Sequence, residues 1–137
     1  MMKIFDKEFI DGLFAEATDS SRLRQNYDLR NSADDTSQRM LNALMPGTEV
    51  PIHQHQITAE TVVCLCGKIE EIIYDVETVI GNNGTENTQF KERLRYLLCP
   101  ELGIYGMQIP KGVWHTVNVI EPSVIFEAKD GAYIPSK

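Results

Sequence analysis

The stretch that decides the fold runs from Gly47 to Gly67 and reads GTEVPIHQHQITAETVVCLCG. It carries two of the three histidines of the chain, His53 and His55, followed by Glu60. In an extended strand, side chains two residues apart point to the same face and lie about 6–7 Å apart along the backbone. His53 and His55 therefore form a natural pair of ligands for one metal ion. The four residues before Glu60 are enough to turn the chain and return this carboxylate to the same place.

The third histidine, His115, lies far downstream in PKGVWHTVN, again beside a Pro-x-Gly turn. A solitary histidine is usually a partly buried polar residue, but three histidines and a glutamate at strand ends are a rare combination. Imidazole and carboxylate ligands suit divalent first-row metals such as zinc, iron, nickel, copper or manganese. The sequence therefore predicts one divalent ion (Zn, Fe, Ni or Mn, with the identity left open), bound by His53, His55, Glu60 and His115.

The spacing of the first segment resembles the first motif of the cupin superfamily at every marked position. A glycine is followed by five residues, His-x-His, four residues, glutamate, six residues and a second glycine. The second segment resembles the second cupin motif through Pro110-x-Gly112 and His115. Two positions depart from that motif, since Gly103 is displaced by one residue and Asn118 comes one residue early. These departures concern turns and packing, and the metal ligands are retained.

The whole chain also resembles the WbuC family of cupin-fold metalloproteins. Four segments carry this resemblance: SSRLRQNYDLR, QRMLNALMPGTEVPIHQH, GVWHTV and FEAKDGAY. The resemblance implies a small β-barrel with a metal in its mouth, a homodimer, and a genomic association with surface-polysaccharide sugar metabolism. It implies no particular reaction.

The expected fold is all-β, a cupin jelly-roll β-barrel (double-stranded β-helix) with an N-terminal α-helix. Short apolar strands with turns every 8–12 residues indicate a sandwich or barrel, and the cupin motifs select the jelly roll. The helix is predicted from apolar residues at four-residue intervals, with Asp6 as N-cap and an end at Asp19–Ser21. We expect residues 1–37 to be helix and irregular connector packing on the barrel, and residues 38–137 to be the barrel, in one domain overall.

Within the barrel, Gly81 to Gly84 predicts an exposed hairpin loop, and Glu121-Pro122 predicts a turn between two strands. Cys64 and Cys66 lie in one apolar strand, where alternation puts both on one face and favours a role as small core residues. The alternative is a thiol near the metal or a redox-sensitive pair. With Cys99 the cysteines are odd in number, which fits a reducing cytoplasm best.

Composition limits the classes of partner. The 137 residues suffice for one domain with a proper core, and the net charge of −7 argues against nucleic-acid binding. The N-terminal stretch mixes charges among its apolar residues, so we expect no signal peptide, and no apolar run is long enough for a membrane helix. We therefore expect a cytoplasmic protein that binds a small molecule.

A basic and aromatic cluster precedes the barrel in this acidic chain. We predict that Arg22, Arg24 and Tyr27 cover the open side of the metal and bind an anionic part of the ligand. The alternative is that this segment is only a solvated connector. The further predicted ligand-binding residues are Gln108, Glu127, Lys129 and Tyr133, although the last three could instead anchor the N-terminal segment. Gln54, Gln56, Gln108 and Asn118 could orient the metal ligands, and Trp114 is expected to pack.

Three functions remain open at this point. Three histidines and one glutamate leave one or two coordination positions free, as in a catalytic metal site. The first hypothesis is therefore a metal-dependent enzyme of the cupin type, an oxygenase, isomerase or hydrolase, with catalytic residues unassigned. The second is a non-catalytic ligand-binding or sensory module, and the third a structural metal site. An enclosed polar cavity at the free position would favour the first over the second.

Overall fold

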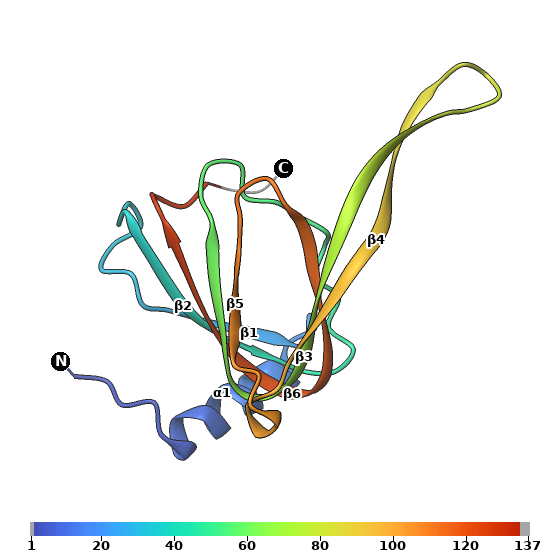
Figure 1. The fold of residues 1–137 in the computed structure, drawn as a ribbon. Helices are drawn as coiled ribbons and strands as arrows, with labels where there is room; N and C mark the ends of the chain where they lie inside the picture. The colour runs from blue at the N-terminus through green and yellow to red at the C-terminus, as the bar shows by residue number, and fades with distance from the viewer. Residues whose placement is uncertain (1, 135–137) are drawn as a thin grey trace.

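The computed structural model of the chain describes residues 2–134. An antiparallel sheet curls into a barrel, and one helix lies outside it (Figure 1). The elements are α1 (Lys7–Asp19), β1 (Arg24–Asp28), β2 (Ser37–Leu44), β3 (Glu60–Ile80), β4 (Glu86–Leu98), a 3-10 turn (Pro100–Leu102), β5 (Gly106–Ile109) and β6 (Trp114–Asp130). This β-rich architecture with one N-terminal helix confirms the predicted fold class.

Two long strands, β3 and β6, organise the sheet. The strand order is β1-β2-β6-β3-β4, with β5 paired to the first part of β3. The first half of β3 pairs with β5 and with the end of β6, whereas its second half pairs with β4 and with the start of β6. Because the partners change halfway along both strands, the sheet bends there and encloses an interior.

The bend depends on a close approach of Gly67 to Ser123. Gly67 has a φ of +94°, and a Cβ at this position would lie 2.2 Å from the Ser123 hydroxyl oxygen and 2.3 Å from the carbonyl oxygen of Pro122. The buried Ser123 hydroxyl accepts from the amide of Lys68 and donates to the carbonyl of Glu121. Only glycine suits this corner, since any side chain would meet the backbone of the neighbouring strand.

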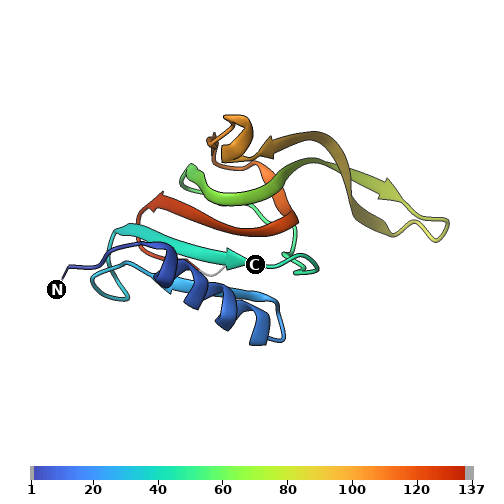
Figure 2. The same ribbon diagram turned by 90° about the horizontal axis from the view of Figure 1, so that it is seen from below.

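The helix α1 covers the outer face of β1, β2 and β6 (Figure 2). Asp6 is its N-cap and accepts a hydrogen bond from the amide of Phe9, and the helix ends before Ser20, as predicted. Its buried residues Leu13 and Ala17 pack on Leu41, Ala43 and Val124 from the sheet. The helix therefore covers the outer face of the sheet and makes no part of the barrel interior.

The barrel interior holds a separate apolar cluster, which explains a wrong prediction about the cysteines. Cys64 belongs to this interior cluster with Val62, Ile69 and other residues. Cys66, in contrast, packs in the cluster beneath α1. The register of β3 shifts between Cys64 and Cys66, and this bulge breaks the alternation that would place them on one face. Both are free thiols that fill cores, and burial raises the pKa of Cys64 to about 11.

Three further expectations need correction or extension. The connector is not all irregular, because Arg24–Asp28 forms strand β1. All of its residues pair with β2. The Glu121-Pro122 step is not a turn between two strands, since β6 continues through it at the bend. The loop at 81–84 exists, but β3 and β4 extend far beyond the barrel before reaching it and form a projecting arm (Figure 1).

Candidate metal centre

The four predicted ligands come together at the mouth of the barrel. His53 and His55 lie in the segment between β2 and β3, Glu60 is the first residue of β3, and His115 is the second residue of β6. One ligand atom from each residue lies within 4.8 Å of the corresponding atoms of the other three. This separation is compatible with a single ion at about 2.0–2.2 Å from each ligand.

The backbone holds two of these side chains in place. His53 and His115 exchange reciprocal backbone hydrogen bonds of 3.0 and 2.8 Å. In addition, Nδ1 of His53 lies 2.9 Å from the carbonyl oxygen of Pro51, and Nδ1 of His115 lies 2.9 Å from that of Val113. A carbonyl can only accept, so each Nδ1 carries the proton and each Nε2 keeps its lone pair for a metal. Backbone carbonyls thus orient the rings, and Asn118 instead donates to Glu70.

The atoms facing the centre of this group suit a cation. Oε2 of Glu60 lies 2.6 Å from Nε2 of His55 and 3.5 Å from Nε2 of His115. Despite these separations, none of the three atoms has a hydrogen bond of acceptable geometry among the described residues. A carboxylate oxygen and the unprotonated Nε2 of His115 are both acceptors, so their approach is favourable only around a proton or a metal ion. The donor set therefore fits a divalent ion.

Electrostatics keep the carboxylate of Glu60 ionised. Burial alone would raise its pKa, but His115, His55 and Lys129 together hold the pKa well below its ordinary value. Burial and the neighbouring His115 lower the pKa of His53. For His115, burial opposes protonation, but Glu60 and the Val113 carbonyl raise its pKa overall. An ionised carboxylate beside unprotonated imidazole is the state in which a metal binds.

A cavity of about 330 Å³ opens directly onto the four ligands. Its polar lining residues beyond the ligands include Arg24, Asn42, Glu71, Glu127 and Lys129. Glu127 accepts a hydrogen bond of 2.9 Å from Asn42, and its Oε2 lies 4.0 Å from Nζ of Lys129. Burial and the charge of Glu60 raise the pKa of Glu127 to about 7. The free side of the metal group thus faces a partly open cavity, in which charged groups stand among apolar ones.

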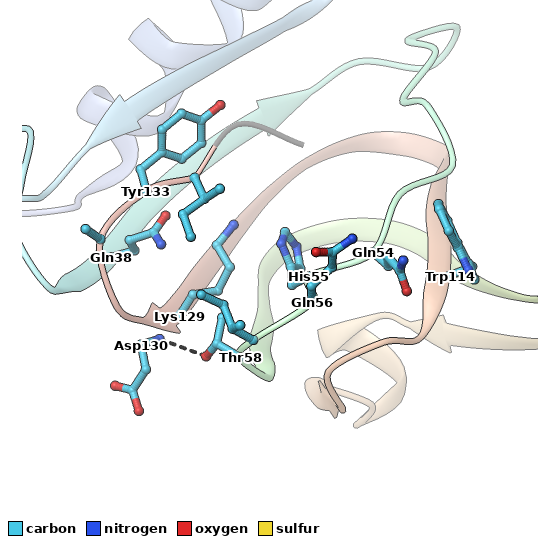
Figure 3. A pocket seen from close by; sticks show the side chains of 12 residues that line it. Gln38, Gln54, His55, Gln56, Thr58, Trp114, Lys129, Asp130 and Tyr133 are labelled. Carbon is cyan, nitrogen blue, oxygen red and sulfur yellow. Dashed lines mark hydrogen bonds between the residues drawn. The ribbon is translucent and has the colours of Figure 1, made fainter. Parts of the chain in front are cut away.

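A second, smaller cavity of about 170 Å³ adjoins the first. Figure 3 shows His55 and Lys129 projecting into it, with Gln54, Gln56 and Trp114 on one side and Gln38 and Tyr133 on the other. His55, Lys129 and Tyr133 line both cavities.

Buried side-chain nitrogen and oxygen atoms without hydrogen-bond partners are confined to these two cavities among the described residues. Within residues 2–134 they belong to Gln38, His55, Glu60, Glu71 and His115, all of which line one cavity or the other. Native proteins satisfy nearly all such atoms, so their gathering in one place suits a bound ion, a polar ligand or ordered water.

The other predicted site residues divide into two groups. Arg24, Glu127, Lys129 and Tyr133 line the cavity, whereas Arg22, Tyr27 and Gln108 are not among its lining residues. In β1, alternation sends Arg24 toward the interior and Tyr27 toward α1, where its ring packs edge-on against Phe9 with a centroid separation of 5.0 Å. Gln108 is an exposed residue of β5.

Sequence reasoning missed Glu71, Asn42 and the lining role of Trp114. Glu71 lies in KIEEIIYD beside a second glutamate, Glu70, and only the strand register makes Glu71 buried and Glu70 half-buried. Alternation places Glu71 with Ile69 and Ile73, but it equally places Glu70 with the buried Ile72, so the local sequence carried no decisive signal.

Three comparisons relate the chain to known proteins. Residues 5–84 match the family described as "Domain of unknown function (DUF6016)". No curated protein matches the chain. Several solved structures share its fold at low sequence identity.

Capsular polysaccharide assembling protein CapF from Staphylococcus aureus has a TM-score of 0.59 and 17% identity, covering 85% of this chain and 30% of CapF. Oxalate oxidase in complex with the substrate analogue glycolate has a TM-score of 0.55 and 11% identity, covering 88% of this chain and 57% of the oxidase.

The cupin domain of Schizosaccharomyces pombe Cnp3 has a TM-score of 0.50 and 14% identity, covering 79% of this chain and 64% of that structure. The chain thus spans less than two thirds of each of these three proteins. At such identities the likeness shows the fold alone, and it confirms the predicted jelly roll. The chain belongs to the DUF6016 family and has the cupin fold.

Proposed function

We propose that the protein binds one divalent metal ion through His53, His55, Glu60 and His115 and uses it to act on a small anionic or sugar-derived molecule. The observation that carries this proposal is the convergence of the four ligand atoms within 4.8 Å at the edge of a 330 Å³ cavity. A divalent ion there supplies Lewis acidity at a free coordination position.

The chain's own residues support an anionic ligand. Arg24 and Lys129 add two positive groups to the cavity, and Lys129 is only 10% exposed. A buried ammonium attracts a carboxylate or phosphate more strongly than an exposed one does, because water screens it less. The cavity volume lies at the small end of ligand pockets, which favours a molecule of monosaccharide size.

The free coordination position faces a cavity lined by charged groups, and this favours a metal-dependent enzyme over a non-catalytic binding or sensory module. A link to surface-polysaccharide sugar metabolism draws support from the fold shared with CapF, whose name describes capsular polysaccharide assembly. The three free thiols support a reducing, cytoplasmic location. Within residues 2–134, no helix is long and apolar enough to cross a membrane.

Elemental analysis of protein purified without added metal tests the first step, and we expect one first-row ion per chain. Incubation of the metal-loaded protein with sugar acids, followed by NMR and by oxygen-electrode measurement, tests the second. Turnover supports the enzyme, and oxygen uptake identifies an oxygenase. Binding without turnover would assign the protein to the non-catalytic class, and absence of an ion even after metal addition would refute the proposal.

A further inference from the structure

Glu71 is a buried acidic residue that the metal group does not use. It lies in β3 on the same face as Ile69 and Ile73, with Val117 of β6 and Tyr96 of β4 as its cross-strand neighbours. Its exposed fraction is 3%, close to the 0% of Ile69 and the 4% of Ile73. A carboxyl group therefore occupies a position as buried as those of the apolar core residues on the same face of the strand.

One carboxyl oxygen of Glu71, Oε2, lacks a hydrogen-bond partner among residues 2–134. The neighbouring Glu70 differs, because it faces the other side of the sheet and accepts from Arg95 and Asn118. A buried carboxyl without a partner costs stability, and an apolar residue of similar volume would remove that cost. The fold itself gives no reason for an acid at this position.

The surroundings of Glu71 do give a reason. Glu71 lines the same cavity as the four metal ligands, together with the cations Arg24 and Lys129 and the carboxyl group of Glu127. The cavity thus combines groups that attract an anion with two carboxyl groups, which suit hydroxyls because a hydroxyl both donates and accepts. A volume of about 330 Å³ admits a molecule of monosaccharide size.

We propose that Glu71 is a ligand-binding residue, and that the ligand is a small hydroxylated acid, such as a sugar acid. The anionic group of this ligand lies toward Arg24, Lys129 and the metal ligands, and one of its hydroxyls hydrogen-bonds Glu71. This inference rests on the proposed function and extends it, since it names a ligand class and a residue outside the metal group.

The protonation state of Glu71 is compatible with this role. Burial, followed by the charges of Glu60 and Glu127, raises the pKa of Glu71 well above its ordinary value. A carboxyl group with a raised pKa keeps its proton to higher pH; a protonated carboxyl donates a hydrogen bond, an ionised one accepts, and a ligand hydroxyl can meet either need.

The test uses the full chain, loaded with Zn²⁺, and calorimetric titration with three probes. D-Glucuronate carries hydroxyls and a carboxylate, acetate carries only the carboxylate, and D-glucose carries only hydroxyls. The variants are Glu71→Leu and the isosteric Glu71→Gln, with Glu70→Gln as the matched control on the opposite face of the same strand. Metal content is measured for every protein before titration.

We expect D-glucuronate to bind the wild type more tightly than either acetate or D-glucose. Glu71→Leu should weaken D-glucuronate binding about tenfold, as the loss of one hydrogen bond to a buried group predicts, with acetate binding unchanged. Glu71→Gln should weaken it less, and Glu70→Gln should leave it unchanged. Because the fold does not need the carboxyl group, Glu71→Leu should be at least as resistant to denaturant as the wild type.

Three results would overturn the assignment: unchanged D-glucuronate affinity in Glu71→Leu, loss of metal in Glu71→Gln, or no D-glucuronate binding by the Zn²⁺-loaded wild type at millimolar concentration. Unfolding of Glu71→Leu would assign a structural role at that position, unless Glu71→Gln folds and shows the weakened binding. A wild type that binds no metal would refute the proposed metal function instead, and the same titrations on the metal-free protein would then decide the role of Glu71.

Discussion

His53 and His115 exchange both of their backbone hydrogen bonds, and their imidazole rings lie with centroids 4.3 Å apart. The two residues come from segments far apart in the sequence, one before β3 and one at the start of β6. Their backbone bridge therefore fixes the distance between two potential metal ligands independently of any ion. A site held by backbone bonds in this way needs little rearrangement when a metal binds.

The first prediction concerns metal content. Replacing His53 and His55 together with alanine removes half of the ligand group, so we expect the stoichiometric ion to be lost. Elemental analysis of wild type and variant, purified side by side, measures this. Gln54→Ala is the control, since Gln54 lies between the two histidines but outside the ligand group. Retention of a full equivalent of metal in the double variant would contradict the site.

The second prediction concerns the corner of the barrel. Gly67→Ala should cost about 3 kcal/mol or more, because it combines a left-handed backbone with a clash against the backbone of β6. Gly84→Ala is the control, since Gly84 also has a positive φ, +79°, but has nothing within 4 Å of an added Cβ. Strain alone should cost the control about 1–2 kcal/mol. Denaturant unfolding measures both, and equal losses would show that contact with β6 is unimportant.

The third prediction separates two neighbouring arginines. Arg24 lines the cavity and Arg22 does not, so Arg24→Ala should weaken D-glucuronate binding about tenfold, whereas Arg22→Ala should leave it nearly unchanged. Metal content should stay the same in both. Calorimetric titration of the two variants checks this, and an equal effect of both substitutions would indicate a general electrostatic contribution from the basic segment.

The fourth prediction is a pH dependence of the metal-free protein. The pKa of Glu71 is raised in the folded state from its ordinary value of 4.5, so the folded chain holds this proton to higher pH than the unfolded chain does. The free energy of unfolding should therefore fall as the pH rises above 4.5, by at most about 1.4 kcal/mol per pH unit for this group.

Glu127 and Glu60 face Glu71 and titrate as well, so the contribution of Glu71 is isolated by difference. The free energy of unfolding of wild type and Glu71→Gln is measured against pH in the presence of EDTA. The difference should move in favour of the variant as the pH rises, because only the wild type loses the contribution of Glu71. Parallel curves would mean that the Glu71 pKa is not raised.

The fifth prediction concerns assembly. We expect a homodimer at tens of micromolar by light scattering. The arm formed by β3 and β4 exposes apolar residues, among them Ile80 with an exposed fraction of 70%. If a second copy of the chain covers the arm, Ile80→Glu should shift the protein toward monomer. Ile57→Glu is the control, since Ile57 is 69% exposed but lines the smaller cavity, outside the arm. A monomeric wild type would refute the prediction.

Much of this architecture could be predicted from local sequence. The limits of α1 follow from Asp6 and from the four-residue apolar period, because helix capping and amphipathicity act over a few residues. The grouping of His53, His55, Glu60 and His115 was predicted from strand alternation and from the cupin-like spacing, and the structure brings these residues together. The metal itself, the ligand and the dimer stay predictions.

Other features depended on tertiary structure alone. Cys64 and Cys66 face different clusters because a bulge interrupts β3, and only the pairing partners of β3 determine where that bulge lies. Arg24 and Tyr27 point to opposite faces because β1 joins the sheet, although the polar composition of this segment indicated a connector.

The sequence by itself thus determined which residues could act as ligands, since ligand chemistry and short-range spacing belong to the chain. Tertiary structure decided which charged groups share one cavity. Glu70 and Glu71 are chemically identical neighbours, yet Glu70 is half-buried and accepts a hydrogen bond from Arg95, whereas Glu71 is fully buried and lines the cavity of the metal ligands. That difference arises from the register of β3 between β4 and β6, because burial and nearby charge depend on contacts between residues far apart in the sequence.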